Sequence, residues 1–453
     1  MAGRRSTFFL AALAAAAGPA ARAGEVEPRE PSEKNRGALY SWKWADNLPY
    51  EYYVPKEYDP KVGANLVLVL HGNGLDYRWT FFNHEAGKFR RDDIVVSPEG
   101  TTYSQAMKTH EFFAGKENVD KLHELIAALK KTFKVRQTFL YGHSQGSFFV
   151  FEYAGMRPDD VDGVVGQSGA LWASSPVGSF GHKQAIALMH GTDDANVPYG
   201  QSVSARDRYR DAGYPMAHLR TLWGWPHAPI ADQAELELSW CEGMTSSDPA
   251  RVEKCLAALS AKQVNGGLDP AALDAVAARL EKMSGAAPAV VSAAKAARAR
   301  VARCAAGVVA AVEKSLGKGK LTKVDGKEWH GLLVRFLEDF DGVPAREAFA
   351  KARAADLATV AKVAEKAGGE FWSNEEKDRT KAALAGADVL ESGWTNASAP
   401  KIAAELAEWR KDAKSMKLSK KDAARIDALL DAWQKGRKEG ADAYAKLLKE
   451  LAD

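Results

Sequence analysis

Cysteine and histidine are scarce in this chain of 453 residues. It holds 3 Cys and 10 His, with no CxxC pair, no HExxH motif and no Cys/His cluster. Metal ions are usually bound by such groupings, so the sequence predicts no metal site and no cofactor. At most one disulfide can form, and Cys241–Cys255, which closes the shortest loop, is favoured over the pairings with Cys304. Three buried free thiols are the alternative, because free cysteine packs as a small apolar residue.

A strong charge of one sign is also absent. The net charge is +3, from 62 Lys+Arg and 59 Asp+Glu, and this balance indicates no nucleic-acid partner. Beyond the N-terminus no stretch approaches 18 uncharged apolar residues, so we expect no integral membrane span. The charges are unevenly distributed, however. Residues 251–453 hold 36 basic and 29 acidic residues, whereas the first 250 hold 26 and 30.

The N-terminus has the three-part pattern of a Sec-type signal peptide. Arg4 and Arg5 provide the positive charge, Phe8–Ala17 is apolar but short, and Ala21-Arg22-Ala23 is a small-x-small cleavage pattern. The sequence therefore predicts cleavage after Ala23 and a secreted or periplasmic protein, with an N-terminal membrane anchor as the alternative. Residues 24–37 are polar and proline-containing, and we expect a flexible mature N-terminus there.

Short apolar runs alternate with helical patterns between residues 38 and 240. Alternation of this kind predicts an α/β fold with a largely parallel central sheet. Each predicted strand is a short apolar run, in most cases closed by glycine, as expected for strands that are buried on both faces. We expect strands at 66–70, 94–96, 138–141, 161–165, 185–189 and 217–222, and helices at 119–132, 147–154 and 203–212.

The composition changes near residue 240, and alanine, lysine and glutamate dominate residues 241–453. This part reads as an all-α domain, with a charged and partly disordered tail as the alternative. Aromatic residues could supply its core, namely Phe336, Phe340, Trp372, Trp394, Trp409 and Trp433. Predicted helices span 271–282, 289–315, 331–340, 345–367, 374–385, 401–414 and 420–434, with starts at Asp269-Pro270 and Ser419 and stops at Gly317 and Gly368.

An α/β domain at 38–240 followed by a helical domain at 241–453 implies that residues 24–250 fold alone. About 220 residues are enough to bury a core of their own. The role of the helical domain is open at this stage. It could be a lid or a substrate-docking module, or an interaction domain that contacts a surface or a protein partner.

The strongest chemical signal is Gly142-His143-Ser144-Gln145-Gly146, which matches G-x-S-x-G. It follows a predicted strand and opens a predicted helix, where a nucleophilic serine sits in a strained turn. Side chains two residues before or after the serine would clash in such a turn, and Gly142 and Gly146 remove that clash. We therefore expect Ser144 to be a nucleophile rather than part of an ordinary turn.

A serine nucleophile needs a base that is oriented by an acid. Asp193 and Asp194 follow the predicted strand 185–189, and His227 follows the last predicted strand. The order Ser, Asp, His along the chain is that of α/β hydrolases. His218 and His182 are the rivals to His227 as base, but His218 lies inside an apolar strand, where a core histidine is expected.

Residues 38–240 resemble the α/β-hydrolase superfamily, and most closely the secreted esterases similar to poly(3-hydroxybutyrate) depolymerases, feruloyl esterases and phospholipase/carboxylesterases. The resemblance rests on the lead-in from Leu48 to Pro60, on Leu70–Gly74, on the G-x-S-x-G turn and on His190–Pro198. It implies that Ser144 is the nucleophile, Asp194 the acid and His227 the base. It also implies an oxyanion hole that is formed by the backbone N–H groups of Asn73 and Gln145.

The predicted activity is hydrolysis of a small-molecule or polymeric carboxylic ester through an acyl-enzyme intermediate. A prolyl-oligopeptidase-type peptidase shares the same turn and triad order. A non-catalytic binding protein on the same fold is the third possibility. Three tryptophans in loops near the same sheet edge could line a substrate pocket, or could simply pack there: Trp172, Trp223 and Trp225.

Overall fold

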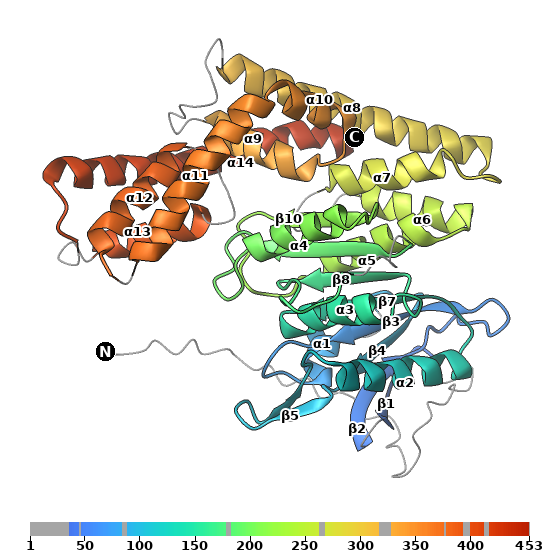
Figure 1. Ribbon diagram of the computed structural model, residues 1–453. Coiled ribbons are helices and arrows are strands. Elements are labelled where there is room, and N and C mark those ends of the chain that lie inside the picture. The colour runs from blue at the N-terminus through green and yellow to red at the C-terminus, as the bar shows by residue number, and fades with distance from the viewer. Residues whose placement is uncertain are drawn as a thin grey trace.

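The computed structural model describes residues 36–44, 47–83, 88–177, 183–261, 268–316, 328–375, 377–392, 399–411 and 416–452. The predicted signal peptide with its cleavage point and most of the predicted flexible N-terminus lie outside the described residues, as do His182, Gly317 and Trp394. In the described part of the chain, no helix combines the length and apolar character needed to cross a membrane. The chain forms a sheet flanked by helices, followed by a large helical region (Figure 1).

The main sheet has eight strands in the order β1-β2-β4-β3-β7-β8-β9-β10. β1 pairs with β2 and β2 with β4 in antiparallel fashion, and all pairs from β4 to β10 are parallel. The predicted α/β fold with a mostly parallel sheet is therefore confirmed. The strands are β1 (Leu39–Trp44), β2 (Leu48–Tyr53), β3 (Ala64–Leu70), β4 (Ile94–Pro98), β7 (Val135–His143), β8 (Gly163–Gln167), β9 (Ala185–Gly191) and β10 (Ala217–Leu222). The antiparallel strands β1 and β2 were not predicted, since neither contains a continuous apolar run.

Both faces of the sheet are covered by helices. Leu66 and Leu68 of β3 belong to the core beneath α2, α3 and α4, whereas Val67 and Val69 belong to the core beneath α5. Successive residues of a strand point to opposite faces, which explains why β3 is apolar throughout. These helices are α1 (Tyr77–Asn83), α2 (Lys116–Thr132), α3 (Gln145–Met156), α4 (Gly200–Asp211) and α5 (Ala231–Thr245).

The rest of the described chain is helical, as predicted. Asp269 and Ser419 start helices as expected: Asp269 Oδ1 accepts the N–H of Ala272 at 2.9 Å, and Ser419 Oγ accepts that of Asp422 at 3.1 Å. The helices are α6 (Pro249–Ser260), α7 (Pro270–Leu280), α8 (Pro288–Leu316), α9 (Glu328–Asp339), α10 (Pro344–Ala352), α11 (Ala354–Asn374), α12 (Arg379–Ser392), α13 (Ala399–Lys411) and α14 (Lys420–Ala452).

Several details of the helical prediction are wrong. The helix expected over 420–434 continues to Ala452, and the helix expected over 374–385 begins at Arg379 and ends at Ser392. The single helix expected over 345–367 is two helices, because the backbone at Arg353 leaves the helical conformation with φ −106° and ψ 11°. Gly368 does not end a helix, since α11 continues to Asn374. Ala367 and Phe371 both lie in the core that α11 shares with its neighbours, so packing outweighs the weak helix propensity of glycine.

The hydrophobic core does not end where the composition changes. One cluster of buried side chains runs from Val165 of β8 through Trp240 of α5 and Val301 of α8 to Phe336 of α9 and Tyr444 of α14. Residue 240, the predicted domain boundary, lies inside α5. In Figure 1, α7 and α8 stack on the layer of α5 and α6, and α11–α13 form a group to one side. That group has its own core, which contains Phe371, Trp409 and Trp433.

A chain that ends at residue 250 should therefore fold poorly, contrary to the expectation from sequence. Removing α7–α14 takes away a large part of the core cluster to which Trp240 and Val252 belong and exposes apolar surface. We expect aggregation or a broad thermal transition, with strong binding of a dye that reports exposed apolar surface. Differential scanning calorimetry of residues 36–250 beside residues 36–453 measures this. A sharp transition of the short chain near that of the long one would restore the two-domain scheme.

The three cysteines are free thiols, and each is buried. The favoured Cys241–Cys255 disulfide is thus incorrect, and the alternative of three free thiols holds. Cys241 Sγ faces the sheet, 3.9 Å from the carbonyl oxygens of Val164 and Ala185. Cys255 packs at Gly243, where a Cβ would lie 3.2 Å from that of Cys255. Residues 241 and 243 point to opposite sides of α5, so the two thiols are directed apart.

The last strand of the sheet is joined to the helical region by a buried charged cluster. His218 Nε2 of β10 lies 2.8 Å from Asp269 Oδ2 at the start of α7 and 3.6 Å from Glu237 Oε2 of α5. Arg220 Nη1 lies 3.5 Å from the same Asp269 oxygen. His218, Glu237 and Asp269 are side-chain types that metals bind. The two carboxylates, however, face the guanidinium and the imidazole, so charge balance within the cluster needs no further cation. β10 is also the edge strand of the sheet, and an edge strand that is covered by helices does not pair with strands of other chains.

This cluster should make the protein less stable at alkaline pH. Burial raises the pKa of Glu237, and the carboxylates of Asp269 and Glu237 outweigh burial to raise the pKa of His218. Both groups bind protons more tightly when folded, so their stabilisation is present at low pH and is lost as pH rises through the folded values. We expect a lower thermal midpoint at pH 8.5 than at pH 6. Glu237→Gln should reduce the difference by about 2 °C, whereas the exposed α5 control Asp232→Asn should not. An unchanged pH dependence in Glu237→Gln would refute this.

Candidate active site

Ser144 occupies a tight turn between β7 and α3. Its backbone has φ 55° and ψ −119°, a left-handed conformation that is unfavourable for a residue with a side chain. A Cβ at Gly142 would collide with the carbonyl of Gly146, and one at Gly146 would lie 2.6 Å from the carbonyl oxygens of Leu70 and His71. Both positions therefore require glycine, and the turn holds Ser144 at the carboxyl end of β7.

Two glycines in and just after β8 leave room for Ser147, which lies in the first turn of α3. Ser147 is fully buried, and a Cβ at Gly166 or Gly169 would lie 2.4 to 2.8 Å from its side chain. The absence of side chains on these two glycines lets α3 begin close to β8. The Ser144 N–H also donates to the Gln167 carbonyl at 2.8 Å, which fixes the turn to the end of β8.

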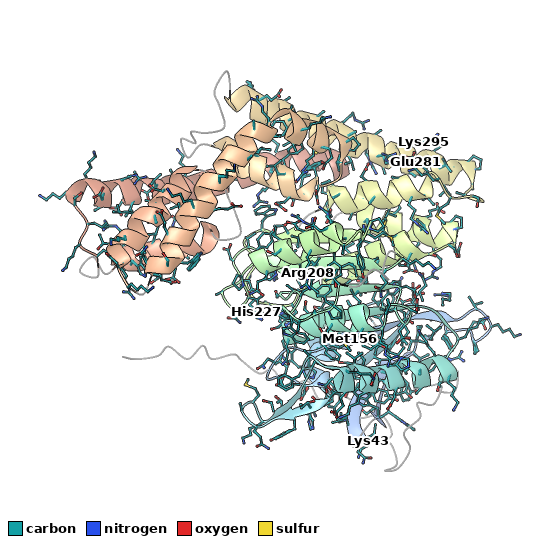
Figure 2. The ribbon with its side chains drawn as sticks, viewed as in Figure 1. Lys43, Met156, Arg208, His227, Glu281 and Lys295 are labelled. Carbon is teal, nitrogen blue, oxygen red and sulfur yellow. The ribbon has the colours of Figure 1, made fainter. Side chains whose placement is uncertain are left out.

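The structure brings Ser144, His227 and Asp194 into one chain of hydrogen bonds. His227 Nε2 lies 3.0 Å from Ser144 Oγ, and His227 Nδ1 lies 2.7 Å from Asp194 Oδ2. Asp194 is buried, whereas Asp193 is exposed and bonds to Thr192 Oγ1 at 3.0 Å. His218, the other described rival for the base, is buried in the cluster on β10. Figure 2 shows His227 at the left-hand edge of the sheet.

The Asp194 carboxylate is surrounded by donors. Its Oδ1 accepts the N–H groups of Asn196 at 2.9 Å and Val197 at 2.8 Å, and its Oδ2 also lies 3.2 Å from His190 Nε2. Burial alone would raise the pKa of Asp194, but the hydrogen bonds from His190, His227 and Val197 outweigh it and lower the pKa below its usual value. The group is therefore ionised at neutral pH and can orient an imidazole.

His190 contacts Asp194, the predicted acid, although the sequence predicted no role for His190. Its Nδ1 lies 2.6 Å from Ser202 Oγ, and its Nε2 lies 2.9 Å from the Val197 carbonyl oxygen. It thus connects the Asp194 loop to α4. The position of His190 at the start of the His190–Pro198 segment was the only sequence signal for this contact.

The two residues predicted to form the oxyanion hole belong to two segments that adjoin the serine. Gln145 is the first residue of α3, directly after Ser144. Asn73 lies in the turn after β3, whose preceding residue Gly72 approaches Ser144 so closely that a Cβ there would lie 3.1 Å from Ser144 Cβ. A donor pair from a helix start and a neighbouring loop is the arrangement that stabilises an oxyanion.

Glu111 supports this loop and was not predicted. It ends the hairpin formed by β5 (Thr102–Ser104) and β6 (Thr109–Glu111). Its Oε1 accepts the N–H of Gly74 at 2.8 Å and the hydroxyl of Thr109 at 2.6 Å, and the residue is fully buried. The hairpin therefore fixes the backbone next to Asn73. No sequence motif marks a carboxylate with this function.

The three tryptophans predicted for a substrate pocket have different surroundings. Trp172 stacks on Phe148 of α3, with ring centroids 5.7 Å apart. Trp225 donates from Nε1 to the Ala228 carbonyl at 2.9 Å, and Trp223 contacts α9. A role of these residues in binding substrate stays a prediction. Trp79 of α1, which was not singled out, lies 6.0 Å from the His143 ring.

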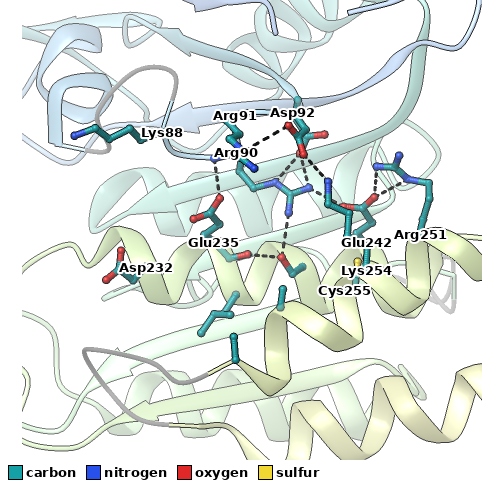
Figure 3. Close-up of a pocket in the computed structure, with 15 residues that line it drawn as sticks. Lys88, Arg90, Arg91, Asp92, Asp232, Glu235, Glu242, Arg251, Lys254 and Cys255 are labelled. Atoms are coloured by element: carbon teal, nitrogen blue, oxygen red, sulfur yellow. Dashed lines mark hydrogen bonds and ion pairs between the residues drawn. The ribbon is translucent and has the colours of Figure 1, made fainter. Parts of the chain in front are cut away.

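A polar pocket of about 490 Å³ lies elsewhere, between the residues that precede β4 and helices α5 and α6 (Figure 3). Arg90 is central to it and donates to Asp93 at 2.6 Å, to Ser239 at 3.1 Å and to Glu242 at 2.7 Å. Because these residues precede β4, the pocket is at the amino edge of the parallel strands, opposite to Ser144. Its central arginine is paired within the pocket, which indicates a structural role in fastening α5 and α6 to the sheet.

Comparison with known proteins supports the fold. The profile of the alpha/beta hydrolase fold family matches residues 65–236, which confirms the predicted resemblance to that superfamily over this segment. No curated protein matches the chain. One similar solved structure is esterase PE8, with 20% identity, coverage of 46% of this chain and 98% of that chain, and a TM-score of 0.35. Another is a Bacillus cereus carboxylesterase, with 16% identity, coverage of 44% of this chain and 95% of that chain, and a TM-score of 0.36. A feruloyl esterase module from Clostridium thermocellum is also similar, with 13% identity, coverage of 49% of this chain and 94% of that chain, and a TM-score of 0.37.

Proposed function

We propose that this protein is a serine hydrolase that cleaves carboxylic esters through an acyl-enzyme intermediate. The observation that carries the proposal is the hydrogen-bonded chain Ser144–His227–Asp194, which begins at a strained turn on the carboxyl edge of the sheet. In α/β sheets this edge is where ligands bind. The substrate would be a small-molecule or polymeric ester.

In the first half of the reaction, His227 Nε2 takes the proton of Ser144 Oγ as the oxygen attacks the ester carbonyl carbon. Asp194 keeps the Nδ1 proton facing it and stabilises the imidazolium that forms. The backbone N–H groups of Asn73 and Gln145 donate hydrogen bonds to the negatively charged carbonyl oxygen and stabilise it. When the tetrahedral intermediate collapses, the C–O bond to the alcohol breaks, and His227 returns its proton to the leaving alkoxide.

In the second half, water replaces the alcohol. His227 takes a proton from the water, whose oxygen attacks the acyl carbon and reforms a tetrahedral intermediate in the same oxyanion hole. The bond to Ser144 Oγ then breaks, His227 returns the proton to the serine, and the carboxylic acid leaves. No step requires a redox partner, and each proton passes through His227.

A comparison of ester and amide substrates tests the proposal against its rivals. We expect the protein to hydrolyse p-nitrophenyl esters, with a preference among acyl lengths, and to leave aminoacyl-p-nitroanilides intact. Faster turnover of the anilides would favour a prolyl-oligopeptidase-type peptidase. Absence of turnover on both panels, together with failure of a fluorophosphonate to label Ser144, would favour a non-catalytic binding protein.

We also propose export through the signal peptide that the sequence predicts. The N-terminal residue of the protein recovered outside the cytoplasm should be Gly24, if cleavage follows Ala23. Recovery of the uncut chain in the membrane fraction would instead indicate an anchor. Contact of residues 241–453 with a surface or a protein partner stays a prediction.

A further inference from the structure

The loop that carries His227 is held on one side by the loop that carries Asp194. Thr192 N–H donates to the Leu222 carbonyl at 3.0 Å, and Gly224 N–H donates to Thr192 Oγ1 at 2.8 Å. Asp193 N–H donates to the Trp225 carbonyl at 3.1 Å. These bonds tie the segment between β10 and His227 to the acid loop, so the relative position of acid and base is partly set by backbone contacts.

The other side of this loop is held by the helical region. Trp223 Nε1 donates to both carboxylate oxygens of Asp339, at 3.0 and 3.2 Å. The guanidinium of Arg335 lies 4.9 Å from the centre of the Trp223 ring, a favourable cation–π distance. Asp339 and Arg335 are four residues apart on α9, so they present one face to the indole.

The Asp339 carboxylate is a strong acceptor for the indole. Its side chain is buried, and burial raises its pKa to about 6, with Arg220 and Arg335 acting in the opposite direction. At neutral pH and above the group is therefore mostly ionised. An ionised acceptor makes a stronger hydrogen bond with the Trp223 N–H than a neutral one would.

The end of α9 is itself fixed on both sides. Phe336 and Phe340 are fully buried, and they contact each other with ring centroids 5.4 Å apart. Asp341, two residues after the end of α9, pairs with Arg210 of α4 at 2.6 Å. Because these contacts hold the end of α9 in place, α9 can determine where the Trp223 ring lies.

We propose that α9 is a positioning element for the base: Asp339 and Arg335 hold Trp223, and Trp223 sets the place of His227 against Ser144. The inference rests on the proposed function, since it assigns His227 its role. It gives residues beyond 241 a part in catalysis through contact with the base loop. Asp339, Arg335 and Trp223 are positioning residues, because they act on the reaction through His227.

Trp223→Phe tests this with the smallest change. The substitution keeps an aromatic ring near Arg335, but it removes the N–H donor together with the five-membered ring of the indole. We expect kcat for p-nitrophenyl acetate to fall about tenfold, because small displacements of catalytic groups cost up to about 100-fold. KM should change less than twofold, and the thermal midpoint should stay close to that of the unmodified protein. Asp339→Leu should lower kcat similarly, whereas Asp339→Asn, which keeps an acceptor, should recover most of it.

Glu338→Gln is the matched control. It removes the ion pair with Arg206 one residue away on the same helix, but it leaves Trp223 and its partners in place. We expect kcat within about twofold of the unmodified protein. If α9 contributed only to stability, the thermal midpoint would fall in all variants. The kcat of Trp223→Phe would then be the same as that of Glu338→Gln.

A second measurement does not depend on turnover. The proton shared by His227 Nδ1 and Asp194 should exchange with solvent faster in Trp223→Phe than in the unmodified protein, as followed by proton NMR. If the full-length protein hydrolyses no ester, the proposed function fails, yet this exchange still decides the inference. Unchanged kcat, or an exchange rate equal to that of the unmodified protein, would overturn the positioning role.

Discussion

Replacing Ser144 by alanine should abolish ester hydrolysis and leave the fold intact. The Oγ atom forms the acyl bond in the proposed reaction, and no other side chain can take its place on the turn. Removal of a catalytic serine costs about 10⁶-fold in kcat in a well-studied protease. We expect the remaining rate to be below about 0.1% of that of the unmodified protein, measured with p-nitrophenyl acetate and confirmed by loss of fluorophosphonate labelling.

Ser168 offers a closely matched control for this change. It also follows a strand, is fully buried and has a left-handed φ of 54°, against 55° for Ser144. Among the described residues its hydroxyl has no hydrogen-bond partner. Ser168→Ala should therefore carry the same backbone cost and leave kcat within a few-fold. A Ser144→Ala protein that kept more than a few per cent of the rate would remove Ser144 from the mechanism.

Asp194→Asn should produce the second largest loss. An amide at this position can turn its NH₂ group toward His227, which then holds the wrong tautomer to accept the serine proton. The corresponding change in trypsin lowers kcat by about 10⁴, and we expect a loss of 10³-fold or more, about 4 kcal/mol of transition-state stabilisation. Steady-state kinetics at pH 7.5 measures it.

Asp193→Asn is the control, because Asp193 is adjacent in sequence but exposed and directed to Thr192 Oγ1. We expect its kcat within about threefold of the unmodified protein, since no proton or charge of the reaction faces it. If Asp193→Asn were the more damaging of the two, the acid would be Asp193, and the hydrogen bond of Asp194 to His227 would have no catalytic meaning.

Sequence reasoning succeeded where the cause is local. A run of apolar residues ending in glycine marks β3, because a strand buried on both faces must be apolar throughout. The turn at Ser144 is recognisable because Gly142 and Gly146 are the two positions where any side chain would collide. Asp269 before Pro270 marks a helix start because a carboxylate caps the free N–H groups within the same few residues.

It failed where the cause is a contact between distant segments. Arg353 breaks the predicted helix 345–367, and α11 passes through Gly368 because Phe371 is buried by other helices. The boundary expected at residue 240 follows a real change in composition. The core nevertheless continues through α5 into α7 and α8, since buried apolar side chains of all three helices belong to one cluster.

The sequence by itself determined the parallel strands and the strained serine turn, because each depends on residues within a few positions of one another, and the order of the candidate serine, acid and base can be read directly along the chain. Only the tertiary structure decided that Glu111 supports the loop at Asn73, that His190 contacts Asp194 and that Trp223 is held by α9. Such pairs are separated by up to 116 residues. Their contact depends on how strands pair and helices dock, which no local pattern specifies.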